Sequence, residues 1–264
     1  MSPHAPPHAG PTAVQKLRVR FAKRGRMRFT SHRDFQRAFE RALRRADVPI
    51  AYSQGFSPHP KVSYAGAAPT GAASEAEYLE ISVTRRCAPS WVAAELDAAL
   101  PPGLDVVKVA EATGGALADR LQASEWEISL PELDPLDVAE AVDAFLGSPS
   151  VEVERVTKNG VRTFDARGVV VRLTVASREW NDPPYAILRM VVRHGTPTVR
   201  PDDVLAGLHR VANLAPPLPP LATRLAQGPL DEGSGTVGDP LEPDRDSAQP
   251  GRADAGAPAK PADA

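Results

Sequence analysis

Cysteine is almost absent from this sequence of 264 residues, and its scarcity excludes several classes of site. Cys87 is the single cysteine, so the chain cannot form an internal disulfide. It also cannot by itself hold a cysteine-ligated iron–sulfur cluster or a zinc ribbon. His194 and His209 have no partner at metal-ligand spacing, and no Gly-rich phosphate loop or nucleophile elbow is present. We therefore expect no metal site and no cofactor.

Long apolar runs are missing as well. No segment approaches the ~18–20 apolar residues that a membrane-spanning helix needs. Residues 1–11 lack the basic start and the apolar stretch of a secretory signal. We therefore expect a cytoplasmic protein that has no membrane partner.

Aromatic residues make up only 5% of the chain, and all 14 of them lie between Phe21 and Tyr185. A segment without large apolar side chains cannot offset its own conformational entropy. We therefore expect disordered ends at residues 1–13 and 226–264, the second of which is acidic and rich in Pro and Gly. Two glycines near residue 114 interrupt the pattern between these ends. This predicts a first module at 14–112, a linker at 113–123 and a second module at 124–225.

The hydrophobic periodicity within these limits predicts an α+β fold. Leu17, Val19 and Phe21 alternate with arginines, as in a half-buried strand. Phe35, Phe39 and further apolar residues then recur at helical spacing. Met27 and Phe29 alternate as well, and further strands are expected at 61–65, 78–83 and 104–109, with a second helix after Pro89. This βαββαβ order is typical of a ferredoxin-like module. The second half repeats it with additions, so we expect tandem ferredoxin-like modules.

A strongly basic segment lies within the nearly neutral chain. Residues 16–61 hold 13 Lys and Arg against three acids, although the formal net charge of the whole chain is −2. Such a local excess favours phosphate-bearing ligands. The residues predicted to bind phosphate are Lys23, Arg26, Arg28, Arg33, Arg37, Arg41, Arg44 and Arg45, with Arg18, Arg20 and Arg24 of the first strand beside them.

The 51–61 loop after the first helix combines aromatic, amide and histidine side chains with two prolines that restrict its backbone. Loops of this composition often carry function. Its candidate ligand-binding residues are Tyr52, Ser53, Gln54, Gly55, Phe56, His59, Pro60 and Lys61. The helix start and a later strand add Ser31, His32, Asp34, Ser74, Glu75, Glu77 and Tyr78, where Ser31 and Asp34 have the spacing of a capping box.

The same residues resemble the radical SAM-linked protein family, a domain of unknown function. The matching pieces are Phe21-Ala22-Lys23, the run from Arg28 to Asp34, the helix from Arg37 to Ala46, the loop from Tyr52 to Pro60 and the run from Ser74 to Tyr78. Arg33 and Ser57 depart from the usual Leu and Asn of the family. The resemblance covers residues 15–215 and implies a radical SAM protein as partner. The chain cannot be that enzyme itself, because the enzyme needs three cysteines for its cluster.

Three functions remain open from the sequence. The first is an accessory protein without catalytic activity, which binds RNA rather than DNA through its basic face and acts with the radical SAM partner. The second is a metal-independent endoribonuclease, because tandem ferredoxin-like modules resemble the RAMP nucleases. His32 or His59 would then be the general acid or base, oriented by Asp34, Glu75 or Glu77. The third is an adaptor that binds only the protein partner.

Overall fold

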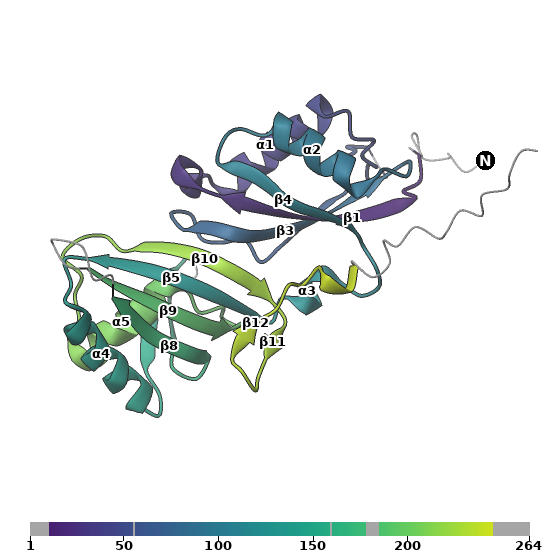
Figure 1. Cartoon of the computed structure of the whole chain (residues 1–264). Helices are drawn as coiled ribbons and strands as arrows, with labels where there is room; N and C mark the ends of the chain where they lie inside the picture. Colours follow the sequence, from purple (N-terminus) through teal and green to yellow (C-terminus); the bar gives the residue numbers. More distant parts are fainter. Residues whose placement is uncertain (1–10, 55, 159, 178–184, 245–264) are drawn as a thin grey trace, which may run out of the picture.

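The computed structural model describes residues 11–54, 56–158, 160–177 and 185–244. They form an α+β fold in which helices pack on one large mixed sheet (Figure 1). The strand order of this sheet is β4-β1-β3-β10-β5-β9-β8, and β2 pairs with β3 beside this path. Within the described ranges, no helix has both the length and the apolar character needed to cross a membrane.

The first half of the chain contains strand, helix, two strands, helix and strand in the expected order. Its elements are β1 (Gln15–Lys23), η1 (Gly25–Phe29), α1 (His32–Arg45), β2 (Val62–Ala65), β3 (Ala73–Val83), α2 (Pro89–Ala99) and β4 (Leu104–Glu111). Met27 and Phe29, which were expected to continue a strand, lie in the 3₁₀ helix η1 instead. The reason is a turn at Gly25, whose φ of 52° ends the extended chain.

The start of α1 follows the sequence prediction. The Asp34 backbone N–H donates to Ser31 Oγ at 3.2 Å, so Ser31 is the N-cap. The apolar stripe of the helix, which includes Phe35, Phe39 and Leu43, is buried against the sheet. The same periodicity leaves the arginines of α1 on the opposite, exposed face.

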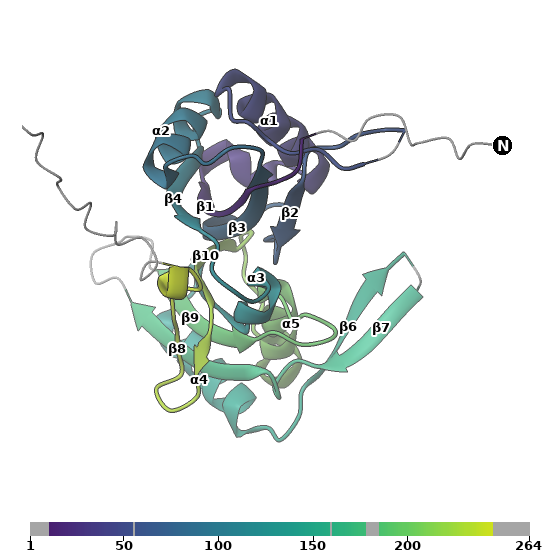
Figure 2. The ribbon, with the colours of Figure 1, turned by 90° about the vertical axis from the view of Figure 1, so that its right-hand side faces the viewer.

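The second half carries an added hairpin, which follows α4 (Pro135–Gly147) and precedes β8 (Val170–Ser177). Its elements are α3 (Leu117–Arg120), β5 (Ala123–Pro131), α4 (Pro135–Gly147), β6 (Glu152–Thr157), β7 (Gly160–Asp165), β8 (Val170–Ser177), β9 (Tyr185–Arg193), α5 (Pro201–Ala212) and β10 (Leu221–Gly228). β6 and β7 pair antiparallel and project from the body of the protein (Figure 2). The predicted turn residue Asn159 lies outside the described residues.

One strand joins the two halves into a continuous sheet. β10 pairs antiparallel with β5 of its own half and parallel with β3 of the first half, at Thr223↔Ala73 and Arg224↔Ser74. Each half still has its own apolar core, one around Phe39 and Leu79 and the other around Phe145 and Leu188. Residues 113–123, expected as a linker, contain α3 and the beginning of β5.

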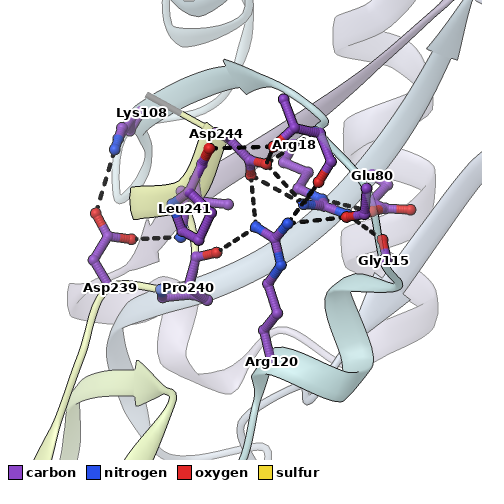
Figure 3. A network of polar contacts seen from close by, with 12 residues as sticks. Arg18, Glu80, Lys108, Gly115, Arg120, Asp239, Pro240, Leu241 and Asp244 are labelled. Carbon is purple, nitrogen blue, oxygen red and sulfur yellow. Dashed lines mark hydrogen bonds and ion pairs between the residues drawn. The ribbon is translucent and has the colours of Figure 1, made fainter. Parts of the chain in front are cut away.

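The expectation of a disordered segment from residue 226 onward is wrong for residues 226–244. These residues complete β10 and form β11 (Leu230–Asp231), β12 (Thr236–Val237) and η2 (Glu242–Asp244). Residues 239–244, the C-terminal strap, lie against α3 and the first half (Figure 3). Residues 245–264 and 1–10 lie outside the described residues.

Burial of a few groups explains how the strap is ordered without any aromatic residue. Leu241 is completely buried beside Leu117, Leu121 and Tyr78. Arg18 Nη1 donates to the Asp244 carboxylate at 2.9 Å, and Arg120 Nη1 donates to it at 3.1 Å. Two arginines thus compensate one buried acid. Arg18, predicted to bind phosphate, is 1% exposed and serves this contact instead.

Candidate ligand-binding cleft

The sheet splits at one edge of β3. β2 pairs with β3 between Tyr78 and Ile81, whereas β10 pairs with it only at Ala73 and Ser74. Within the described part of the chain, no strand pairs with the segment between these two pairings on that edge, and the connection at residues 66–70 passes it. A cavity of about 490 Å³ opens there, lined by both halves of the chain.

Aromatic rings form one wall of this cavity. Phe21 stacks on Phe35 with ring centroids 4.4 Å apart, and Tyr64 meets Phe35 edge-on at 5.9 Å. The ring of His32 packs edge-on against Tyr64 at 5.0 Å. Burial raises the pKa of the Tyr64 phenol, which therefore stays neutral in this wall. Phe21 and Phe35 are buried and stack on each other, so the accessible rings of this wall are those of Tyr64 and His32.

A buried ion pair lies at the split. The Arg224 guanidinium bonds the Glu77 carboxylate, and both side chains are about 95% or more buried. Arg224 Nε also donates to Ser74 Oγ at 3.3 Å, and the Ala68 N–H donates to Glu77 Oε2 at 3.1 Å. Burial opposes ionisation of Glu77, but Arg224, Ser74, Ala68 and Lys23 outweigh it and hold its pKa below the usual value. Glu77 therefore remains a carboxylate.

Lys23 contributes a second buried cation to the cavity wall. The residue is 5% exposed, and its Nζ donates to the Pro69 carbonyl at 3.4 Å. Burial lowers the pKa of this ammonium, while the nearby Glu77 acts in the opposite direction. The ammonium has three N–H donors, and this long hydrogen bond uses one of them. Lys23 can therefore bind a further acceptor.

A second cavity of about 240 Å³ continues the cleft into the second half and shares Ala67, Pro69 and Arg200 with the first. His194 lines it and is fixed on both sides, since its Nε2 lies 2.7 Å from Ser124 Oγ and its Nδ1 lies 2.7 Å from the Leu121 carbonyl oxygen. Burial lowers the pKa of His194, which favours the neutral ring.

The 51–61 loop lies outside both cavities. Tyr52 pairs with Pro60 in a short bridge, and the Ser53 N–H donates to the His59 carbonyl at 2.8 Å. The His59 N–H donates in turn to Ser53 Oγ at 2.9 Å, so hydrogen bonds between Ser53 and His59 close the loop on itself. Phe56 is 95% exposed, and Gln54, His59 and Lys61 are exposed as well. Gly55 lies outside the described residues.

The two candidate histidines therefore occupy different surroundings. His32 lines the larger cavity and its Nε2 lies 3.1 Å from Gln36 Nε2, whereas His59 belongs to the exposed loop. The carboxylates predicted to orient them are engaged elsewhere. Glu75 pairs with Arg24, Glu77 pairs with Arg224, and Asp34 accepts from Ser31 Oγ at 2.7 Å.

The predicted phosphate-binding residues divide into three groups. Lys23 lines the cavity, and Arg28 Nε bonds the Gly71 carbonyl oxygen. Arg24 bridges Glu75 and Asp105, and Arg20 Nε bonds the Glu75 carbonyl oxygen at 2.9 Å. The exposed group consists of Arg26 in η1 and Arg33, Arg37, Arg41, Arg44 and Arg45 in α1. Across the described part of the chain, Arg37 alone in this group lies near a carboxylate, 3.9 Å from Asp34.

Sequence reasoning missed the half of the cleft that comes from the C-terminal part of the chain. Arg224, Gln227, Arg200 and Asp202 were not predicted as site residues, and no spacing links them to β3 in the sequence. Gly66 carries the clearest local signal: its φ is +59°, and a Cβ there would meet Gln227 Oε1 at 2.3 Å. Among the described residues, no three His, Cys, Asp or Glu side chains are grouped as a metal ion would require.

Comparison with known proteins adds a family and little else. Residues 16–201 match a family described as an uncharacterized protein conserved in bacteria, DUF2344. No match was found among the curated proteins. The solved structures that match include DyPB from Rhodococcus jostii RHA1, at 12% identity over 76% of this chain and 85% of that chain. The TM-score of that match is 0.21, too low to support any argument from it.

Proposed function

We propose that this chain, which belongs to the DUF2344 family of uncharacterised bacterial proteins, binds RNA along α1 and at the mouth of the cleft. The observation that carries the proposal is the adjacency of two surfaces. His32, the first residue of α1, lines the cavity, and the exposed arginines begin at the next residue, Arg33. RNA-binding proteins commonly combine such a basic track with aromatic surfaces for unstacked bases.

The arginines of α1 suit the phosphate backbone of RNA because few carboxylates compensate their charge. Arg33, Arg41 and Arg44 are exposed and have no ion pair with any carboxylate that the structure describes. Phosphate contacts by such residues add affinity without sequence preference and make binding depend strongly on salt. The cleft would then supply selectivity for an unpaired nucleotide, since the rings of Tyr64 and His32 offer surface against which a base can pack.

The experiment measures affinity for a 3′-labelled single-stranded RNA of roughly 12 nucleotides at several salt concentrations. We expect the triple variant Arg37/Arg41/Arg44→Ala to bind more weakly and to lower the slope of log K against log salt by about 2, at about 0.7 per phosphate contact. The matched control Lys158/Arg162/Arg210→Ala removes the same charge from exposed residues of the second half and should leave the slope unchanged. Salt-independent binding by the unmodified chain would exclude the proposal.

RNA cleavage is the second candidate function. His32 lies in the cavity wall and His59 does not, so His32 is the better candidate for the catalytic residue. Incubation of RNA with the protein in chelator tests it. Cleavage that His32→Ala abolishes and His59→Ala leaves intact would make the chain a metal-independent nuclease. Intact RNA after long incubation would exclude cleavage and keep RNA binding as the proposed function.

A radical SAM protein remains the proposed partner, implied by the family resemblance of residues 21–78. Purification of the chain from bacterial cytoplasm, with and without ribonuclease, tests this part separately. Retention of a radical SAM protein after ribonuclease treatment, without bound RNA, would favour the adaptor function instead.

A further inference from the structure

The larger cavity contains a cation with unused hydrogen-bonding capacity. Among the described residues, the Lys23 ammonium has one hydrogen-bond acceptor, the Pro69 carbonyl at 3.4 Å, although it is 95% buried. A buried charge is costly unless it is paired, and Glu77 already bonds Arg224 and the Ala68 N–H. An anionic ligand in the cavity would supply the acceptors that Lys23 lacks.

Two helices begin at the same cavity. Thr30 and His32 line it at the N-terminus of α1, and Arg200 and Asp202 line it at the N-terminus of α5. The partial positive charges of these N-termini are already met by the first-turn carboxylates Asp34 in α1 and Asp202 and Asp203 in α5. The case for an anion therefore rests on the side chains of the cavity wall.

The charges at the cavity leave a positive balance when acids and bases are counted together. Glu77 bonds Arg224 and also lies near Lys23, and Asp202 and Arg200 are both exposed at the rim, where solvent screens them alike. Two acids therefore stand against the three cations Lys23, Arg200 and Arg224. The exposed Arg200 guanidinium, which borders both cavities, has no ion pair within the described residues. Lys23 in the wall and Arg200 at the rim thus leave an excess of positive charge.

We propose that this cavity binds a nucleoside phosphate monoester, with the phosphate on Lys23 and Arg200 and the base against Tyr64 and His32. A volume of about 490 Å³ suits one small-molecule ligand rather than a folded strand. A monoester is doubly charged above its second pKa of about 6, so it gains more from these cations than a backbone diester does. The ligand is either a free nucleotide or the 5′-phosphorylated end of an RNA, and the second case rests on the proposed function.

The experiment compares three probes: AMP by titration calorimetry, and a 3′-labelled single-stranded RNA carrying either a 5′-phosphate or a 5′-hydroxyl. We expect the 5′-phosphorylated RNA to bind about tenfold more tightly than its 5′-hydroxyl counterpart, as one charge-assisted hydrogen bond predicts. Lys23→Met and, separately, the surface variant Arg200→Gln should remove this preference. The Arg37/Arg41/Arg44→Ala variant should weaken the binding of both RNAs and leave the ratio of their affinities unchanged.

Each outcome separates this inference from the proposed function. AMP binding without RNA binding would support the phosphate site and exclude the RNA-binding proposal. Equal binding of both RNAs without AMP binding would support the RNA-binding proposal and exclude the phosphate site. If Lys23→Met fails to fold, Arg200→Gln alone tests the assignment. A folded variant of either kind that keeps the full preference for the 5′-phosphate would overturn the assignment.

Discussion

The pair of Glu77 and Arg224 is the residue-scale contact that joins the two halves. Glu77 lies on β3 and Arg224 on β10, so the ion pair forms only when the C-terminal strand docks on the first half. Both side chains are 95% or more buried, so bulk solvent does little to replace a lost partner. Their contact links folding of the cleft to assembly of the whole sheet.

Removal of one partner should therefore lower the free energy of unfolding more than removal of both partners. We expect Glu77→Gln to lower the free energy of unfolding by about 3–5 kcal/mol, because it leaves a buried guanidinium without a counter-charge. The double variant Glu77→Gln/Arg224→Met should recover part of this loss. Urea unfolding of the four members of the cycle measures the coupling, and additive losses would contradict it.

Tyr78 gives a pH-dependent signal from a buried position. Burial raises the pKa of Tyr78 to about 12, from an ordinary value near 10. The folded state binds this proton more tightly than the unfolded state. The contribution to stability is therefore complete below pH 10 and is lost as the pH rises toward 12.

Alkaline titration followed by ultraviolet absorbance measures this ionisation. Tyr78→Phe should remove phenolate absorbance that develops near pH 12 and flatten the loss of stability between about pH 10 and 12. Unchanged late absorbance in the variant would assign it to another tyrosine.

At the scale of an element, the start of α1 determines one wall of the cavity. Ser31 Oγ accepts from the Asp34 N–H, which places His32 at the cavity and the arginines on the surface. We expect Ser31→Ala to cost about 1 kcal/mol of stability, and Ser31→Gly only a few tenths, because glycine is tolerated at an N-cap. Thermal or urea unfolding measures both. Equal losses for the two variants would show that the cap is not the cause.

The elements themselves were largely predictable from local pattern. The alternation at Leu17, Val19 and Phe21 and the helical spacing of Phe35 and Phe39 depend on periods of two and 3.6 residues, which a strand or helix shows wherever it lies. β10 was missed because its burial comes from a partner strand about 150 residues away in sequence. The 3₁₀ helix η1 was missed because its alternation resembles that of a strand.

At the scale of the whole molecule, the C-terminal strap closes the polar network in Figure 3. Burial opposes ionisation of Asp244, but hydrogen bonds from Thr113 and the Arg18 guanidinium outweigh it and lower its pKa. A depressed carboxyl pKa stabilises the fold above the unfolded value near 4, and this contribution is lost as the pH falls through the folded value.

Asp244→Asn should therefore destabilise the protein at neutral pH and make its stability depend less on pH below about 4. Unfolding curves at pH 7 and at acidic pH measure both effects. Deletion of residues 239–264, compared with deletion of 245–264, isolates the strap. Equal stability of the two truncated chains would contradict a structural role for residues 239–244.

Local sequence pattern was enough to predict most elements, the N-cap of α1 and the exposed arginines on its outer face. These features follow from neighbours a few residues apart, so local periodicity and composition are sufficient to predict them. Tertiary structure alone decided that Lys23, Glu77, Arg200 and Arg224 surround one cleft, that His59 lies outside it, and that Arg18 binds Asp244 rather than a ligand. The physical reason is that pairing of β10 with β3 and burial of the strap bring together residues from opposite ends of the chain, and no local pattern records such contacts.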